Sequence, residues 1–350
     1  MDHFETLGRR VEDRWRRVEY DERVFAELAY VALAEDPPRA STVDLARWLL
    51  SLETLPLQQV IEGVFGQPAV TVWRGRRCFI DVYFWLDGTT AIHQHGFAGA
   101  FHVLAGSSLH GDYRFRETRR MSSAFLLGEL ELRSMRLLPA GTTLPIVPGE
   151  ALIHSLFHLE RPSVSVVIRN PGPTHSAPAY EYRWPGLALD PFHEDVTTTK
   201  ALQLITMLHR AGEPAVDDLT GDLLERADLH TAYLVLRRCL SLRGLRVERL
   251  DTLLARVARA HGDDAVAHLA GVLDEDARLE RLVRLREMVH GPDSRFILAV
   301  LRSAPGRQVA LELLAERWPD EEPLTRIDRF VDELAGLEVN DPEILEPLFG

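Results

Sequence analysis

Two short groups of histidines are the residues of this sequence best suited to chemistry. His93 and His95 lie in AIHQHGF, and His154 and His158 lie in ALIHSLFH about sixty residues later. Side chains alternate between the two faces of a β-strand, so residues two apart point the same way. Neutral imidazoles suit divalent Fe, Zn, Cu or Ni, and a third inward histidine completes a facial set that leaves other positions open. The spacing therefore predicts a metal site at His93, His95 and His154.

The part of the chain that must position these histidines has the sequence pattern of β-strands. From Ala69 to Asn170 it contains short β-rich runs separated by Gly, Pro and Asp-Gly turns. The runs are AVTVW, CFIDVYFWL, TAIHQHG, FHVLAGS, GDYRFR, FLLGELELRSMRLL, TTLPIV, EALIHSLFHL and SVSVVIRN. Strands this closely spaced predict an antiparallel barrel or sandwich. Asp87-Gly88 introduces the first histidine strand and Pro148-Gly149 the second.

Apolar residues at helical spacing occupy both flanks of this β-rich part. In the N-terminal flank, Asp36-Pro37-Pro38 separates two predicted helices, and Ser41-Thr42 is the expected N-cap of the second. The predicted fold class is α+β and multidomain, with a central antiparallel β-barrel or sandwich between helical parts. The expected domains are an N-terminal helical segment at 1–66, a barrel at 67–175, an irregular linker at 176–196 and an all-helical C-terminal domain at 197–350.

The amino-acid composition limits the classes of protein to which this chain can belong. The chain has 350 residues, of which 46% are hydrophobic, so it can bury a core without covalent links. Its two cysteines, Cys78 and Cys239, fit no thiolate-zinc spacing. No secretion signal or membrane span is recognisable, so we expect a cytoplasmic protein with no membrane partner. The net charge of −13 argues against nucleic acid as a partner.

The histidine groups and their flanking glycines resemble the two motifs of the cupin superfamily, small antiparallel β-barrels (double-stranded β-helices) that hold one metal ion. The resemblance covers about residues 68–173. The matching positions of the first motif are Gly88, His93-Gln94-His95, Gly99 and Gly106, and those of the second are Pro148-Gly149, His154 and His158. Gly99 stands where the family has a glutamate ligand, and His158 stands where it has an asparagine. The resemblance therefore implies a three-His site without a carboxylate.

A three-His cupin is similar to the thiol dioxygenases of the cysteine dioxygenase type, in which ferrous iron binds substrate and O2 together. This resemblance implies Fe(II) as cofactor, although three histidines also accept Zn, Ni, Cu or Mn. A tyrosine that some of these enzymes carry would fall at about Arg169, which is therefore expected beside the metal or in the pocket. Their substrate-carboxylate arginine lies upstream of the His-x-His strand, where Arg74 and Arg77 are the candidates. The more positive metal site favours anionic substrates.

The remaining residues of the expected site are assigned by strand geometry. His158 shares a face with His154 but lies about 13 Å away on a straight strand of about 3.3 Å per residue, so we expect it beside the site rather than on the metal. Phe97, just after His95, is expected to approach the open coordination positions. Gly96 and the glycine at 99 interrupt the strand register, so the facing of His102, a further pocket candidate, stays open.

Two functions of different classes follow. The first is a cupin-type non-haem Fe(II) dioxygenase that activates O2 on a small or peptide-borne substrate. The alternative is a non-catalytic, ligand-sensing or scaffold cupin whose helical C-terminal domain binds a protein partner or a second copy of the chain. A Zn or Ni isomerase or hydrolase would need a general base, and the nearest carboxylate to the motifs is Glu150, in an expected turn.

Overall fold

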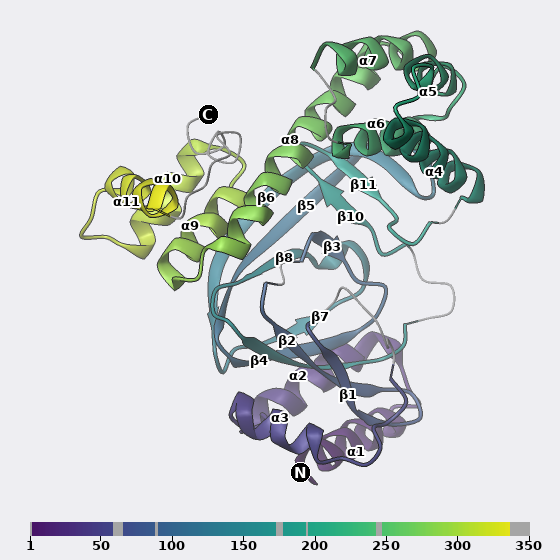
Figure 1. The fold of residues 1–350 in the computed structure, drawn as a ribbon. Helices are drawn as coiled ribbons and strands as arrows, with labels where there is room; N and C mark the ends of the chain where they lie inside the picture. The colour runs from purple at the N-terminus through teal and green to yellow at the C-terminus, as the bar shows by residue number, and fades with distance from the viewer. Residues whose placement is uncertain are drawn as a thin grey trace. The chain divides into compact units, whose positions relative to one another are not determined.

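The computed structural model describes residues 2–58, 66–87, 90–172, 178–193, 195–242 and 247–336 (Figure 1). Contacts between residues divide the chain into two units, and neither unit is a single continuous segment. The first comprises 1–114, 131–179 and 282–350, and the second comprises 115–130 and 180–281. The consecutive domain boundaries drawn from the sequence stay a prediction, because these units join segments that lie far apart in the chain.

One antiparallel sheet of the first unit forms from the early and late strands of the β-rich part. Its order is β1-β2-β9-β4-β7, with strands at Ala69–Arg74, Phe79–Trp85, Ser163–Arg169, Gly99–Ala105 and Thr143–Ile146. In the centre of the sheet, Asp81 and Phe101 both pair with Val167 of β9. Alternation therefore places Asp81, Phe101 and Val167 on one face of the sheet.

A second group of strands carries the histidines. It contains β3 (Ile92–Gln94), β8 (Ile153–His158), β5 (Ser107–Ser122) and β6 (Phe125–Pro139), with β3 and β5 both antiparallel to β8. Apolar side chains of both groups meet between them in one core, which includes Phe101, Val103, Leu138, Ile146 and Val167. The face of the first sheet that carries Asp81 is therefore its inner face.

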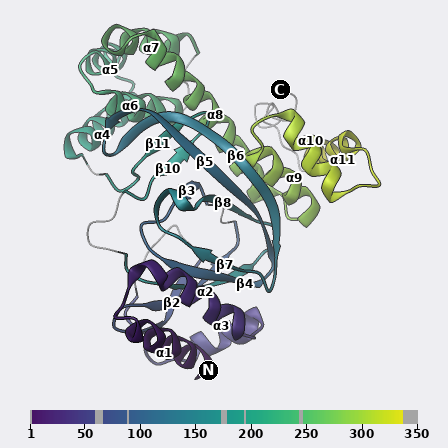
Figure 2. The same ribbon diagram turned by 180° about the vertical axis from the view of Figure 1, so that it is seen from behind.

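The N-terminal helices cover the other face of the first sheet (Figure 2). They are α1 (Asp2–Arg17), the short 3-10 helix η1 (Glu22–Val24), α2 (Phe25–Glu35) and α3 (Thr42–Leu50). Their apolar side chains share a core with the outward side chains Ile80, Val82 and Ala100. Helix α2 ends before Asp-Pro-Pro, and the Ser41 hydroxyl accepts the Asp44 N–H at 3.1 Å, which confirms the predicted break and N-cap.

The second unit combines the far end of the β5–β6 hairpin with a short hairpin and helices. Strands β10 (Glu181–Arg183) and β11 (Leu187–Leu189) pair with each other, and β11 also pairs with β6. The helices are α4 (Val196–Ala211), α5 (Val216–Leu224), α6 (Leu229–Ser241), α7 (Val247–His261) and the first part of α8 (Asp263–Met288). The expected irregular linker at 176–196 thus contains a hairpin. Its strands are three residues long, too short to show an alternating pattern.

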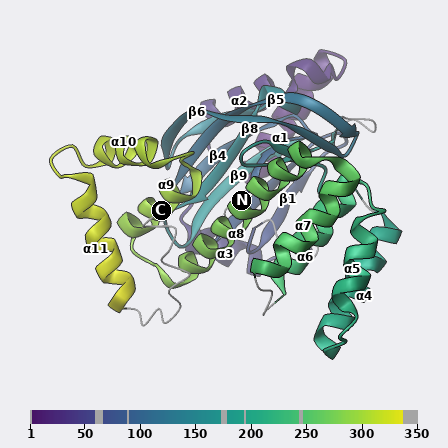
Figure 3. The ribbon, with the colours of Figure 1, turned by 90° about the horizontal axis from the view of Figure 1, so that it is seen from above.

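The last helices belong to the first unit. They are the end of α8, α9 (Pro292–Ser303), α10 (Arg307–Arg317) and α11 (Pro323–Gly336) (Figure 3). Within the described residues, no helix has both the length and the apolarity needed to span a membrane. The fold class is as predicted: α+β, with an antiparallel barrel or sandwich core between N-terminal and C-terminal helices.

Candidate metal centre

Strand pairing brings three histidines together. His93 lies opposite His154 in the β3–β8 register, and His95 follows directly after β3 on the same side as His93. One ring nitrogen from each of the three residues lies within 4.8 Å of those of the other two. The side chains of His93 and His154 are buried, whereas that of His95 is half-buried. The three residues chosen from the sequence are therefore neighbours, and His95 is the most exposed of them.

The arrangement of nitrogens fits one bound divalent ion. The Nε2 atoms of His95 and His154 are 2.8 Å apart. Two nitrogens on one metal at about 2.1 Å, at right angles, would lie about 3 Å apart. His93 Nδ1 lies 2.8 Å from the Ala91 carbonyl oxygen, so Nδ1 carries the proton and Nε2 keeps its lone pair for a metal.

Burial keeps the imidazoles of His95 and His154 neutral, which is the form that binds metals. The pKa values of His95 and His154 lie well below 6.5, first because burial disfavours the charged ring and then because neighbouring histidines would repel the charge. Arg169 also lowers the pKa of His95. At neutral pH the rings of His95 and His154 therefore offer lone pairs without having to lose a proton.

A fourth histidine, His110 on β5, supports the group and was not assigned to the site from the sequence. Its Nε2 lies 3.1 Å from Nδ1 of His154. Burial, with Arg136 and His93, lowers the pKa of His110 to about 4. If His154 binds a metal through Nε2, its Nδ1–H must donate to His110 Nε2, so the ring of His110 acts as acceptor. The β5–β8 register that brings these residues together was not readable from spacing.

Arg169 lies on the inner face of the first sheet, next to His95. Its guanidinium lies 4.7 Å from the ring centre of Phe97 and 4.8 Å from that of Phe79, and the Phe97 and His95 ring centres are 4.7 Å apart. Arg169 Nε donates to the buried carboxylate of Asp81 at 3.1 Å, and the arginine side chain is 19% exposed. Phe97 and Arg169 thus form one side of the site.

Asp81 is a second residue that spacing did not reveal. It also accepts hydrogen bonds from the Thr71 hydroxyl at 2.7 Å and the Tyr83 hydroxyl at 3.1 Å. Burial raises the pKa of Tyr83, so this phenol remains a proton donor. These bonds fix Asp81, and through it the guanidinium of Arg169.

Gly99 explains physically why the site has no carboxylate at this position. Gly99 faces Arg169 across the β4–β9 ladder. A Cβ atom at residue 99 would lie 2.2 Å from the carbonyl oxygen of Ile168 and 3.1 Å from Cβ of Arg169. The close approach of β9 therefore requires glycine, and the space that a longer side chain would need is occupied by the neighbouring strand.

The two arginines proposed to bind substrate differ in their surroundings, and their assignment stays a prediction. Arg77 packs over the ring of Tyr20, with its guanidinium 4.6 Å from the ring centre. Arg74 is exposed and directs its guanidinium toward the Leu57 carbonyl oxygen at 3.5 Å. Arg74 is the last residue of β1, where it pairs with Phe79 and has its guanidinium 5.4 Å from the centre of that ring, whereas Arg77 lies between β1 and β2. The arginine beside the histidines is Arg169.

His102 and His158 also lie away from the three-His group. His102 points to the outer face of β4, where Nδ1 lies 2.8 Å from the Thr143 hydroxyl, because its parity is opposite to that of the inward Phe101. It lines a surface hollow with Pro38 and Leu104, and is not part of the barrel interior. His158 is buried farther along β8, stacked on Trp85 at 4.5 Å, and is not among the three candidate ligands.

Two further positions complete the account of the motifs. Asp112 lies opposite His154 in the β5–β8 register, but its carboxylate is 4.0 Å from Arg133 and is not part of the histidine group. Gly106 has a positive φ of 78° between β4 and β5, as a turn glycine requires. Gly88, the first glycine of the motif, lies outside the described residues.

Comparison with known proteins gives similarities to solved structures only. No family model matches the sequence, and no curated protein matches it. A cupin superfamily protein from Desulfitobacterium hafniense is 15% identical, with a TM-score of 0.21, over 34% of this chain and 96% of that one. The DMSP lyase DddQ from Ruegeria pomeroyi is 15% identical, with a TM-score of 0.24, over 42% and 74%. An oxalate oxidase is 23% identical, with a TM-score of 0.20, over 36% and 56%. Scores this low do not define a family or an activity for this chain.

Proposed function

We propose that His93, His95 and His154 hold one divalent metal ion, Fe(II) foremost, and that the protein is a cupin-type non-haem iron dioxygenase. The observation that supports this most is the donor set: three imidazole nitrogens within 4.8 Å of one another, in a group with no carboxylate. Such a set balances none of the metal charge, so an anionic substrate ligand is favoured. The proposed substrate is a small or peptide-borne molecule with an anionic group.

The residues around the site have distinct parts in this proposal. When bound, Fe(II) would take substrate and O2 in the positions left open and supply the redox chemistry. Arg169 would bind the anionic group of the substrate, because a guanidinium can donate two parallel hydrogen bonds to a carboxylate. Asp81 keeps that guanidinium in place through its bond to Nε. Phe97 provides an apolar wall that limits water beside His95.

Metal analysis of protein purified with and without air tests the metal site. We expect about one iron per chain in anaerobic wild type, in keeping with a single mononuclear site. His93→Ala and His154→Ala should lose it. His102→Ala is the matched control, because His102 faces away from the interior, and it should keep the metal. Wild-type protein that folds normally yet binds no divalent metal would overturn the proposal.

Oxygen uptake with paired substrates tests the reaction class. Small thiols and amino acids, each with and without a carboxylate, are compared in wild type and Arg169→Lys. A lysine keeps the charge but loses the two-pronged geometry, so we expect KM to rise about tenfold for the carboxylates alone. Uptake with no member of the panel would count against the dioxygenase, and uptake with non-thiols alone would exclude the thiol class that the sequence suggested.

The alternative proposal is a ligand-sensing or scaffold protein that binds a partner through its helices. The second unit supports it, since that unit has its own apolar core around Tyr233 and Leu236 and, in its described part, no histidine group of metal-binding geometry. Stoichiometric metal with no turnover of any substrate, together with capture of a defined partner by the full-length protein through its helices, would favour this alternative.

A further inference from the structure

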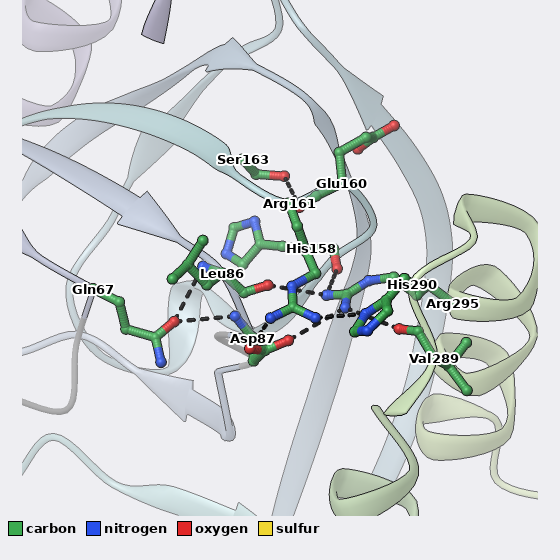
Figure 4. Close-up of polar contacts among 10 residues, drawn as sticks. All are labelled: Gln67, Leu86, Asp87, His158, Glu160, Arg161, Ser163, Val289, His290 and Arg295. Carbon is green, nitrogen blue, oxygen red and sulfur yellow. Dashed lines mark hydrogen bonds and ion pairs between the residues drawn. The ribbon is translucent and has the colours of Figure 1, made fainter. Parts of the chain in front are cut away.

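A buried arginine from the C-terminal helices reaches the strands that carry the candidate ligands. Arg295 of α9 has a side chain with 0% exposure. It donates to the carbonyl oxygens of His158 at 2.9 Å and of Leu86 at 3.4 Å, and pairs with Asp87 Oδ1 at 3.4 Å (Figure 4). It also donates to the Val289 carbonyl at 3.4 Å. One guanidinium therefore joins α9 to the end of β8 and to the segment before β3.

The segment before β3 is held from several sides. Gln67 Oε1 accepts the N–H groups of Leu86 and Asp87 at 3.1 and 3.0 Å. Arg161 pairs with the other oxygen of Asp87 at 2.8 Å and donates to His290 Nδ1 at 2.6 Å (Figure 4). A buried charge is costly unless it is paired and hydrogen-bonded, and Asp87 and three carbonyl oxygens supply such partners for Arg295.

The network is attached to β8 at the His158 carbonyl, and further hydrogen bonds join Thr90, just before β3, to β8. Between its attachment at residue 87 and the candidate ligands, Thr90 N–H donates to Leu156 O at 2.9 Å, and Leu156 N–H donates to the Thr90 hydroxyl at 2.7 Å. A second arginine of α9, Arg302, donates to the Thr90 carbonyl at 3.3 Å. His93 and His154 lie directly opposite each other a few residues further on. A shift of either strand end would change the separation of their ring nitrogens.

We propose that Arg295 is a positioning residue for the three-His centre: it fixes the relative placement of β3 and β8, and so makes the geometry of the ligands depend on α9. The proposal rests on the proposed metal site. It gives the last helices a part in that site, although they contribute no ligand. Loss of Arg295 should loosen both strand ends and widen the spread of nitrogen positions, while leaving the ligands themselves present.

The test compares Arg295→Met, Arg295→Lys and the matched control Arg307→Met, which alters an exposed arginine at the start of α10. Co²⁺ is the probe, because its visible spectrum reports ligand number and geometry. We expect Arg295→Met to bind Co²⁺ about tenfold more weakly, the lower end of the range for residues that orient metal ligands. Its spectrum should change, and its metal-induced rise in Tm should shrink. Arg295→Lys keeps a positive charge at the same place. Its Co²⁺ affinity should therefore lie between those of wild type and Arg295→Met.

Hydrogen exchange of the metal-free proteins supplies a measurement that needs no metal. Amides of residues 90–95 and 153–158 should exchange faster in Arg295→Met than in wild type or in Arg307→Met. If the Arg295 variants have a lower Tm but unchanged Co²⁺ affinity, spectrum and exchange in these strands, the positioning role is wrong and the arginine is merely structural. If wild type binds no Co²⁺ but the exchange difference appears, the metal site fails and the coupling of α9 to these strands stands.

Discussion

At the scale of single residues, the proton on His154 is the feature that decides whether this ring can bind a metal. His110 is placed to accept Nδ1–H of His154 at a distance of 3.1 Å. We predict that His110→Leu lowers divalent metal affinity about 10- to 100-fold, the usual effect of removing the acceptor of a metal-bound histidine. His110→Gln, which offers an amide oxygen, should retain most of the affinity.

Competition against a chromophoric chelator measures these affinities. His102→Gln is the control, because this histidine lies on the outer face of β4 and contacts Thr143. Equal affinities for wild type and His110→Leu would show that the 3.1 Å contact has no part in metal binding.

A second prediction at this scale concerns pH. Burial, with Arg286 and Arg295 nearby, lowers the pKa of His158 to about 3. An unfolded histidine takes up its proton near pH 6.5, so between pH 6.5 and about 3 the unfolded chain binds more protons. The stability that neutral, buried His158 contributes to the folded protein is therefore fully present above pH 6.5. It is lost progressively as the pH falls from 6.5 toward about 3. From one such histidine we expect a loss of about 2 kcal/mol at pH 5.

Urea unfolding of the metal-free protein at pH 7.5 and 5.0 measures this loss, with His158→Phe as the comparison. A phenyl ring can keep the stacking on Trp85 but cannot take up a proton. The drop in unfolding free energy between the two pH values should be about 2 kcal/mol smaller in the variant. An identical drop would mean that His158 does not remain neutral in the folded protein.

At the scale of strands, the close approach of β4 and β9 fixes glycine at position 99. Gly99→Glu would restore the residue type of the resembling family, but its Cβ would lie 2.2 Å from Ile168 O. We predict destabilisation by more than about 2 kcal/mol, as for overpacked core positions, with no gain of a metal ligand. Gly99→Ala should show most of the same loss.

Thermal unfolding and metal titration check this prediction. Gly306→Ala is the control, because a Cβ there meets no atom within 4 Å. A stable Gly99→Glu variant that binds metal more tightly would show that β9 can move aside.

The same strands show how far sequence patterns reach. Alternation placed His93 and His95 on one face, and each of the nine β-rich runs corresponds to a strand. Pairing register could not be predicted in this way, because it depends on turn geometry and on contacts between distant segments. That is why Asp81 and His110 entered the site only with the structure. Arg169 was already a pocket candidate, because a tyrosine of the resembling family would fall there, and Arg74 and Arg77 were chosen by their place upstream of His93.

At the scale of the whole molecule, the two units have separate apolar cores, and the candidate metal ligands belong to the first unit alone. We predict two thermal transitions in calorimetry, of which metal raises one. A metal ion at 100 times its Kd stabilises the state that binds it by about 2.7 kcal/mol. A substitution in the core of the second unit, for example Leu236→Ala, should lower the midpoint temperature of the other transition.

His154→Ala, which keeps two of the three candidate ligands, serves as the control, since metal should then move neither transition. A single transition whose midpoint rises with metal would show that the two units unfold together. The hairpin β5–β6 and helix α8, which contribute residues to both units, would then be the link between them.

The attachment of Arg295 to the strand ends also has a consequence for synthesis of the chain. A ribosome extends a chain by about 5–20 residues per second, so α9 would follow β8 by roughly ten seconds. During that interval the ligand strands exist without the arginine that joins their ends. Chains interrupted before α9 would therefore carry all three histidines yet load metal poorly, so that metal uptake would favour chains that have been synthesised through α9.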